Sequence, residues 1–325
     1  MSATHGRAAD WLAPGRSEPG PLMTRPPTFS VIVPTYQRAA TLAGCLDALG
    51  AQTLERDRFE VVVVDDGSAE PPRQVVGHAA GALDIRLIEQ ANAGPASARN
   101  AGANAARGAY VVFTDDDCRP DPGWLRALDV MTARHPGCAV GGRVVNALGD
   151  GLYSTASQLL IEFLYEYYNV DETGGRFFVT SNLALPTETF RRIGGFDTSF
   201  PLAAGEDRDL CDRWREAGLR IVYCEEAVVH HAHALSVRSF CRQHFNYGRG
   251  AFHLHRARRR RGESPLRVEP PKFYTRLVGF PFGHAPAART VPLSALMALS
   301  QAVYVSGYLA ERVRSRVPSS ASGSA

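Results

Sequence analysis

The stretch FEVVVVDDGS, Phe59 to Ser68, is apolar at five of its first six positions and then ends in two aspartates and a turn sequence. A strand with one face in water alternates apolar and polar residues, whereas a continuous apolar run indicates a strand covered on both faces. The stretch therefore predicts a buried strand of a parallel sheet, with polar groups at its carboxyl end.

Neighbouring segments repeat this pattern. FSVIVPTY (29–36), DIRLIEQ (84–90) and AYVVFTDDD (109–117) are further buried strands, and the stretches 39–51 and 94–108 have the composition and spacing of helices. Strands that alternate with helices are typical of an α/β fold in which helices cover both faces of a parallel sheet.

Polar residues follow three of these strands, where ligands bind in such sheets. They are Thr35 and Tyr36 after the first, Asp65 and Asp66 after the second, and Asp115 to Asp117 after the fourth. Three consecutive aspartates repel one another unless they are solvated or a cation gathers them. The pattern predicts one crevice that holds a ligand and a cation.

Composition excludes several classes of protein. With 325 residues, 45% apolar and 21% charged, the chain can bury a large core. Its six cysteines form no CxxC pair, which argues against a zinc site or a disulfide framework and fits a reducing cytosol. Neither GxGxxG nor GxxxxGK[ST] occurs, and Lys272 is the only lysine, so dinucleotide and P-loop fingerprints are absent.

The remaining chemistry fits a nucleoside diphosphate. The carboxylate of Asp66 can accept hydrogen bonds from a base or ribose, Arg99 can neutralise a diphosphate, and the aspartate cluster can bind Mg²⁺ or Mn²⁺. Each feature also has an ordinary structural explanation: a turn, an arginine on a helix surface, and a solvated loop.

Five segments together resemble family 2 glycosyltransferases with the GT-A fold. They are VIVPTYQR (31–38), VVVVDDGS (61–68), NAGPASARNAG (92–102), FTDDDC (113–118) and the segment 191–221. The resemblance covers about residues 29–235 in the order that the family shows. It implies a nucleotide-sugar donor, a divalent metal held by a DxD motif, and inversion at the anomeric carbon.

The resemblance also implies site residues. The donor would contact the ends of the strands and the helix after them: Pro34, Thr35, Tyr36, Arg38, Asp66, Gly67, Arg99, Asp115 and Asp116. Asp115 and Asp117 would form the DxD motif that holds Mg²⁺ or Mn²⁺, and Asp117 is the one expected to ligate the metal directly. HHAH (230–233) ends a strand, where His231 and His233 share one face and His230 points the other way. His231 is the predicted third metal ligand, and a structural cluster is the alternative.

The segment GED, Gly205 to Asp207, resembles the ED motif of the family. Asp207 is the predicted base for the acceptor hydroxyl, and Glu206 would orient the acceptor or begin the helix. An ordinary acidic helix N-terminus is the alternative. No QxxRW motif follows, which favours transfer of a single sugar over processive synthesis. A sugar nucleotidyltransferase and a non-catalytic nucleotide-sugar-binding relative are the other candidate functions.

The sequence divides into four parts. Residues 1–28 lack the apolar core of a signal peptide and are predicted to be a disordered leader, with Met23 as an alternative start. Residues 29–235 are predicted to form the catalytic domain, 236–315 a basic helical extension, and 316–325 a disordered tail.

The expected acceptor is a hydroxyl on a saccharide, a lipid-linked molecule or a secondary metabolite, and no nucleic-acid partner is expected.

The extension carries unusual charge patterning. Between Ala234 and Arg276 there are eleven Arg and Lys but two Glu, while residues 290–310 carry no formal charge. Ser294 and Gln301 would lie on one face of a helix over 291–310, as in a helix that lies in an interface or packs on its own domain. We expect a cytoplasmic enzyme bound peripherally to the anionic inner face of the cell membrane. A soluble enzyme whose tail caps the catalytic domain is the alternative, with the basic run as solvated surface.

Overall fold

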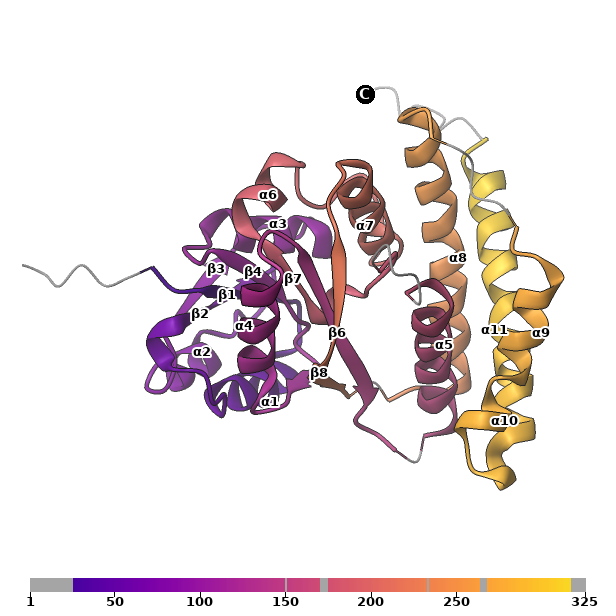
Figure 1. Cartoon of the computed structure of the whole chain (residues 1–325), viewed down its shortest axis with the longest axis horizontal. Helices are drawn as coiled ribbons and strands as arrows, with labels where there is room; N and C mark the ends of the chain where they lie inside the picture. Colours follow the sequence, from indigo (N-terminus) through magenta and orange to yellow (C-terminus); the bar gives the residue numbers. More distant parts are fainter. Residues whose placement is uncertain (1–25, 150, 170–174, 233, 264–267, 317–325) are drawn as a thin grey trace, which may run out of the picture.

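The computed structural model describes residues 26–149, 151–169, 175–232, 234–263 and 268–316. A sheet with its covering helices forms one half of the molecule, and a group of long helices forms the other (Figure 1). Nearly all of the predicted leader and tail lies outside the described residues, so neither prediction is tested.

The first four strands form the predicted parallel sheet. Its order is β3 (Ile85–Glu89), β2 (Phe59–Asp65), β1 (Phe29–Thr35) and β4 (Tyr110–Phe113), and all neighbours in this part are parallel. Every residue of β2 is buried, as the apolar run predicts.

Helices cover both faces of this sheet. Alternate residues of β1 and β2 pack into two separate apolar clusters, because successive side chains of a strand point to opposite faces. One cluster includes α1 (Ala39–Gly50) and α4 (Trp124–Arg134), and the other includes α3 (Pro95–Ala105). The short helix α2 (Arg73–Ala79) precedes β3.

The second half of the sheet is mixed. Beyond β4 come β7 (Leu183–Pro186), β6 (Ala139–Asn146), β8 (Ile221–His231) and β5 (Cys118–Pro120). β7 is antiparallel to both β4 and β6, β8 is parallel to β6, and β5 is antiparallel to β8. The helices α6 (Thr187–Arg192) and α7 (Glu206–Glu216) lie between β7 and β8 in the chain. The pairing of Cys118 with His231 brings the end of β8 beside the aspartates.

The helical half contains α5 (Leu152–Tyr168), α8 (Val237–Arg260), α9 (Pro271–Gly279), α10 (Pro281–His284) and α11 (Ala287–Arg314). A third apolar cluster, centred on Phe163, Phe240 and Met297, joins α5, α8, α9 and α11. α8 begins with a capping box in which the Ser236 hydroxyl accepts from the backbone N–H of Ser239 at 3.2 Å.

Two glycines allow α8 and α11 to lie side by side (Figure 1). A Cβ atom at Gly248 would stand 1.8 Å from the carbonyl oxygen of Tyr304, and one at Gly307 would stand 2.0 Å from that of Phe245. Only glycine fits at either position. Near the far end of α11, Glu311 accepts hydrogen bonds from Arg249 at 2.6 Å and His253 at 3.1 Å, so α11 is docked on α8 by packing and by charge.

The buried face of α11 is mixed, because Leu293 and Met297 are buried together with several polar side chains, whereas the outward face is largely apolar. The polar side chains Thr290, Ser294 and Ser300 are buried against the protein, whereas Val291 and Val305 are 70% and 52% exposed. The sequence pattern of Ser294 with Gln301 suggested a helix that lies in an interface or packs on its own domain. The structure shows packing on the domain, with Ser294 facing inward.

The basic run 256–261 is partly internal. Arg258 pairs with Asp212 at 2.9 Å and Arg261 pairs with Asp209 at 2.6 Å, both on α7. Arg256, Arg259 and Arg260 are exposed. Part of the run is therefore exposed to solvent, and part of it links α8 to α7 through ion pairs.

Candidate active site

Asp66 at the end of β2 organises the entry to α3. Its carboxylate accepts hydrogen bonds from the side chain of Gln90 at 2.7 Å and from the backbone N–H groups of Ala93 at 2.9 Å and Gly94 at 2.8 Å. Gly67 follows with φ of 84° and lies against Asn92. Both oxygens of Asp66 are thus engaged within the protein, and its predicted contact with a nucleotide stays a prediction.

The ends of β1 and β4 are joined by a cluster of charged side chains. The Thr35 hydroxyl donates to Asp116 at 2.8 Å, and Arg38 spans Asp116 at 2.8 Å and Asp117 at 2.6 Å. Burial raises the pKa of Asp116 to about 6, against the opposing effects of Arg38 and Thr35. The structure therefore brings together the predicted residues of both strand ends. Of the other predicted residues at the end of β1, Pro34 is half-buried and Tyr36 is exposed.

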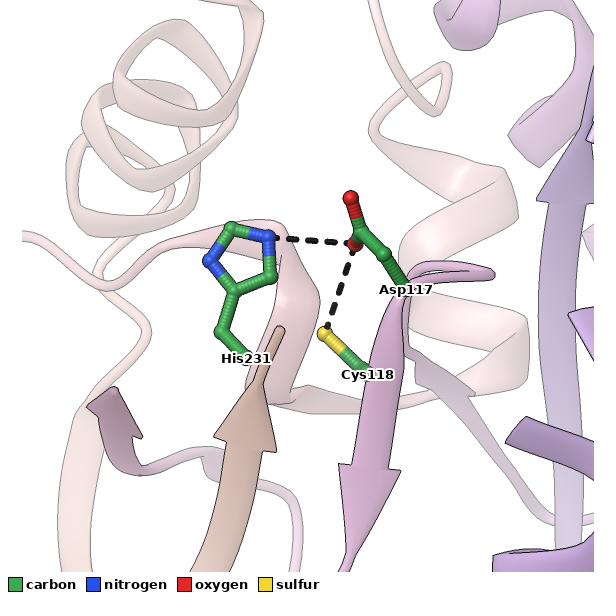
Figure 2. Close-up of side chains that lie close together, drawn as sticks. All are labelled: Asp117, Cys118 and His231. Carbon is green, nitrogen blue, oxygen red and sulfur yellow. Dashed lines mark hydrogen bonds and ion pairs between the residues drawn. The ribbon is translucent and has the colours of Figure 1, made fainter. Parts of the chain in front are cut away.

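A possible metal site lies beside this cluster (Figure 2). His231 Nε2 lies 3.1 Å from Asp117 Oδ1, and Cys118 Sγ lies 4.0 Å from the same oxygen. Burial alone would raise the pKa of Asp117, but the hydrogen bond and charge of His231, together with Arg38, outweigh it and hold the pKa well below its usual range. His230 points elsewhere and contacts Asp121 at 2.8 Å, as strand alternation predicts. His233 lies outside the described residues.

Asp115 does not join this group. Arg99, buried on α3, donates to Asp115 at 2.8 Å and to Glu206 at 3.0 Å. A buried guanidinium needs carboxylate partners, and Asp115 supplies one, so the two aspartates of the predicted DxD motif face different partners. Asp115 remains close enough for its charge to act on His231.

The start of α7 places the two predicted catalytic acids. Gly205 precedes the helix with φ of 91°, a conformation that favours glycine. Glu206 is buried on Arg99, and burial, followed by the charge of Asp207, raises its pKa to about 7. Asp207 is half-buried; its Oδ1 accepts from the backbone N–H of Arg208 at 2.7 Å, and burial raises its pKa. Asp209, by contrast, is fully buried in structural ion pairs.

Other residues of the site are not predicted from the sequence. Cys118 directly follows the aspartates in the sequence, and this position is the only feature that marks it as a candidate metal ligand. Gln243 and Tyr247 come from α8, where Gln243 Nε2 donates to the Tyr247 hydroxyl at 2.7 Å and Gln243 Oε1 is buried without a partner among the described residues. Burial raises the pKa of Tyr247 to about 12, and the charges of Asp207 and Glu206 add to the shift. No motif in α8 marks these two residues.

Sequence comparisons find several glycosyltransferases that are similar to this chain. Residues 30–194 match glycosyl transferase family 2, and residues 166–234 match the N-terminal domain of galactosyltransferase. The chain is 29% identical over 227 residues to the glycosyltransferase AglE of Haloferax volcanii, an alignment covering 69% of this chain and 73% of AglE. It is 32% identical over 234 residues to validoxylamine A glucosyltransferase of Streptomyces hygroscopicus, covering 62% of this chain but only 54% of that protein.

Solved structures share the fold. The mannosyltransferase PcManGT from Pyrobaculum calidifontis, in complex with GDP-Man and Mn²⁺, gives a TM-score of 0.57 at 22% identity and covers 93% of this chain and 77% of its own. Residues 1–349 of Staphylococcus aureus TarS, in complex with UDP-GlcNAc, give 0.54 at 20% identity, covering 89% of this chain and 92% of that one.

The mixed sheet, its helices and the acidic strand ends define a glycosyltransferase of the GT-A fold that uses a nucleotide sugar. The chain belongs to glycosyl transferase family 2.

Proposed function

We propose that this glycosyltransferase moves one sugar from a nucleoside diphosphate sugar to an acceptor hydroxyl, with inversion at the anomeric carbon. The observation that carries the proposal is the bridge that Arg99 makes between Asp115 and Glu206. It links the strand end that bears the acidic cluster to the helix end that bears Asp207. A donor bound at the first and an acceptor bound at the second would meet at Arg99.

The donor site would lie at the ends of β1, β2 and β4. Arg38 and Arg99 are the cations there, and the nucleotide sugars bound by PcManGT and TarS support a site of this kind. Thr35 and Asp66 would orient the nucleotide through hydrogen bonds, with Pro34, Tyr36 and Gly67 shaping the edge. The base and the sugar are open to assay with a panel of donors.

The donor atoms beside Asp117 fit a divalent cation. A carboxylate oxygen and an imidazole nitrogen lie within ligand range of one another, with a thiol next to them. The imidazole favours Mn²⁺ over Mg²⁺, whose protein ligands are oxygens. Asp117 and His231 would hold the metal. When bound, it would supply positive charge that stabilises the leaving diphosphate.

Asp207 would take the proton of the acceptor hydroxyl. Inversion by direct displacement requires one base on the face opposite the leaving group. The raised pKa of Asp207 suits proton transfer, because burial makes its carboxylate more basic. Glu206 would hold Arg99 and orient the acceptor.

Release of nucleoside diphosphate from a panel of UDP-, GDP- and TDP-sugars tests the proposal. The Asp207→Asn variant should lose about 10²-fold or more in kcat with little change in donor affinity. If the donor Kd changed as steeply as kcat, Asp207 would belong to the donor site. A sugar nucleotidyltransferase would instead make the donor from a sugar phosphate, and a non-catalytic relative would bind the donor without releasing diphosphate.

We also propose that the outward face of α11 lies on the cytoplasmic membrane surface. The helix is long and apolar enough to cross a bilayer, but its polar side chains Thr290, Ser294 and Ser300 face the protein, and its docking on α8 uses Glu311 and two glycines. Exposed apolar side chains at Val291, Val305 and Leu309 suit shallow burial in the headgroup region. A lipid-linked acceptor would reach the site from this surface. The alternative is a soluble enzyme whose tail caps the domain.

A further inference from the structure

Arg208, the residue after the proposed base, is the basic exception in an acidic helix start. The first turn of α7 contains Glu206, Asp207 and Asp209, whose negative charges suit the positive end of the helix dipole. A cation at this position is opposed by the same dipole. Its presence calls for compensating contacts.

Two aromatic rings hold the Arg208 guanidinium. Its central carbon lies 4.9 Å from the centroid of the Phe177 ring and 5.4 Å from that of Tyr168. Tyr168 is fixed in turn, because its hydroxyl donates to Glu269 Oε1 at 2.6 Å. These ring contacts stabilise the cation and fix its position.

The two rings contact the guanidinium but carry no charge of their own. In the part of the chain that the structure describes, Arg208 makes no ion pair with a carboxylate, although it hydrogen-bonds to the hydroxyl of Tyr168. Arg99, by contrast, pairs with two carboxylates, Asp115 and Glu206. The remaining N–H groups of Arg208 form the planar fork that binds a carboxylate or phosphate through two hydrogen bonds.

Arg208 lies on the side of α7 that faces away from the predicted donor residues. α7 lies between the sheet and the long helices (Figure 1). Glu206 contacts Arg99 on the sheet side, whereas Arg208 contacts Tyr168 of α5 on the helical side. The predicted donor residues are all at strand ends or on α3. Asp207 thus separates the donor cations from Arg208.

We propose that Arg208 binds an oxyanion, a carboxylate or a phosphate, that the acceptor carries near the hydroxyl deprotonated by Asp207. The proposal rests on the proposed glycosyl transfer and narrows its acceptor class. The two rings fix the fork before the acceptor arrives, so less side-chain entropy is lost on binding. Gln243 Oε1, buried and unpartnered among the described residues, can accept a hydrogen bond from a hydroxyl of the same acceptor.

Three acceptors that share one sugar ring test this inference. With the donor that the panel identifies, kcat/KM is measured for methyl glucoside, methyl glucuronide and glucose 6-phosphate, which carry no charge, a carboxylate and a phosphate. We expect the wild-type enzyme to prefer a charged acceptor by about tenfold or more. The preferred one of the two charged acceptors shows whether Arg208 binds a carboxylate or a phosphate.

The Arg208→Gln variant should lose this preference through a higher acceptor KM. Arg208→Lys, which keeps the charge but not the fork, should retain part of it. Arg215→Gln is the matched control, because Arg215 lies exposed on the same helix. Thermal unfolding of each variant shows whether it is folded.

Equal use of charged and neutral acceptors by the wild-type enzyme would overturn the inference. Loss of all three acceptors to the same degree in Arg208→Gln, or a loss in donor KM, would overturn it as well, since Arg208 would then be structural or part of the donor site. These outcomes leave glycosyl transfer itself in place. Only the absence of nucleoside diphosphate release with every donor and acceptor would contradict that.

Discussion

Arg99 and Glu206 stand 107 positions apart in the sequence, and Nη1 of the first lies 3.0 Å from Oε1 of the second. Both side chains are buried, and the other arm of Arg99 holds Asp115. The pair fixes the start of α7 relative to the end of β4.

Replacing Arg99 by Gln should therefore destabilise the fold. The change leaves the buried carboxylate of Glu206 without its cation, a kind of loss that costs about 3–5 kcal/mol. Urea unfolding measures it. Arg73→Gln is the matched control, because its pair with Glu89 is exposed and such pairs contribute about 0–1 kcal/mol. Equal losses in the two variants would show that burial does not set the strength of the Arg99 pair.

Removal of metal should abolish most of the activity. We expect excess EDTA to stop release of nucleoside diphosphate and Mn²⁺ to restore it, because the leaving diphosphate needs positive charge. Full activity in EDTA would contradict the metal site. His231→Ala should weaken Mn²⁺ binding by about tenfold or more. Electron paramagnetic resonance measures this binding. The matched control is His230→Ala, since His230 faces Asp121 on the other side of β8.

His244 should make the fold less stable in mild acid. It is buried on α8, with its Nε2 3.4 Å from the Ser157 hydroxyl, and burial lowers its pKa to about 4. In the unfolded chain its pKa is about 6.5, so between these values the unfolded state binds a proton that the folded state excludes. This contribution to stability is complete above about pH 6.5 and is lost as the pH falls toward 4, at up to about 1.4 kcal/mol per unit.

Urea unfolding of wild-type protein and of His244→Gln at about pH 7 and about pH 5 measures this effect. The variant should lose less stability between the two pH values than the wild type does. His78→Gln, at an exposed position on α2, should keep the wild-type dependence. If all three proteins lost the same amount, other groups would dominate the acid response.

The parallel half of the sheet and the strand ends that carry the candidate site could be predicted from the sequence because their signals are local. Buried strands are continuous apolar runs, and the ends of β1, β2 and β4 carry the motifs themselves. The mixed half could not be predicted, because β6 and β7 pair with strands that are distant in the sequence. For the same reason, the separation of Asp115 from Asp117 depends on Arg99 and could not be anticipated.

The orientation of α11 also lies beyond the sequence. Its composition shows an uncharged helix with scattered serines, but only the packing against α8 and α5 decides that Ser294 and Ser300 point inward. The outward face is left with Val291, Leu299, Val305, Leu309 and Val313 exposed. These exposed apolar side chains allow the membrane proposal to be tested by point substitution. Truncation would be less clear, because it would also uncover the apolar cluster around Phe240 and Met297.

We predict that the wild-type protein sediments with vesicles containing anionic lipid at low salt and is released by high salt or alkaline carbonate. Val305→Glu with Leu309→Glu should keep the protein in the supernatant, because each change removes about 1.5–3 kcal/mol of apolar burial. Val130→Glu is the control, since Val130 is 45% exposed on α4 of the catalytic half and should not contact lipid. Sedimentation that is the same for all three proteins would exclude α11 as the membrane-binding surface and favour its role as a cap.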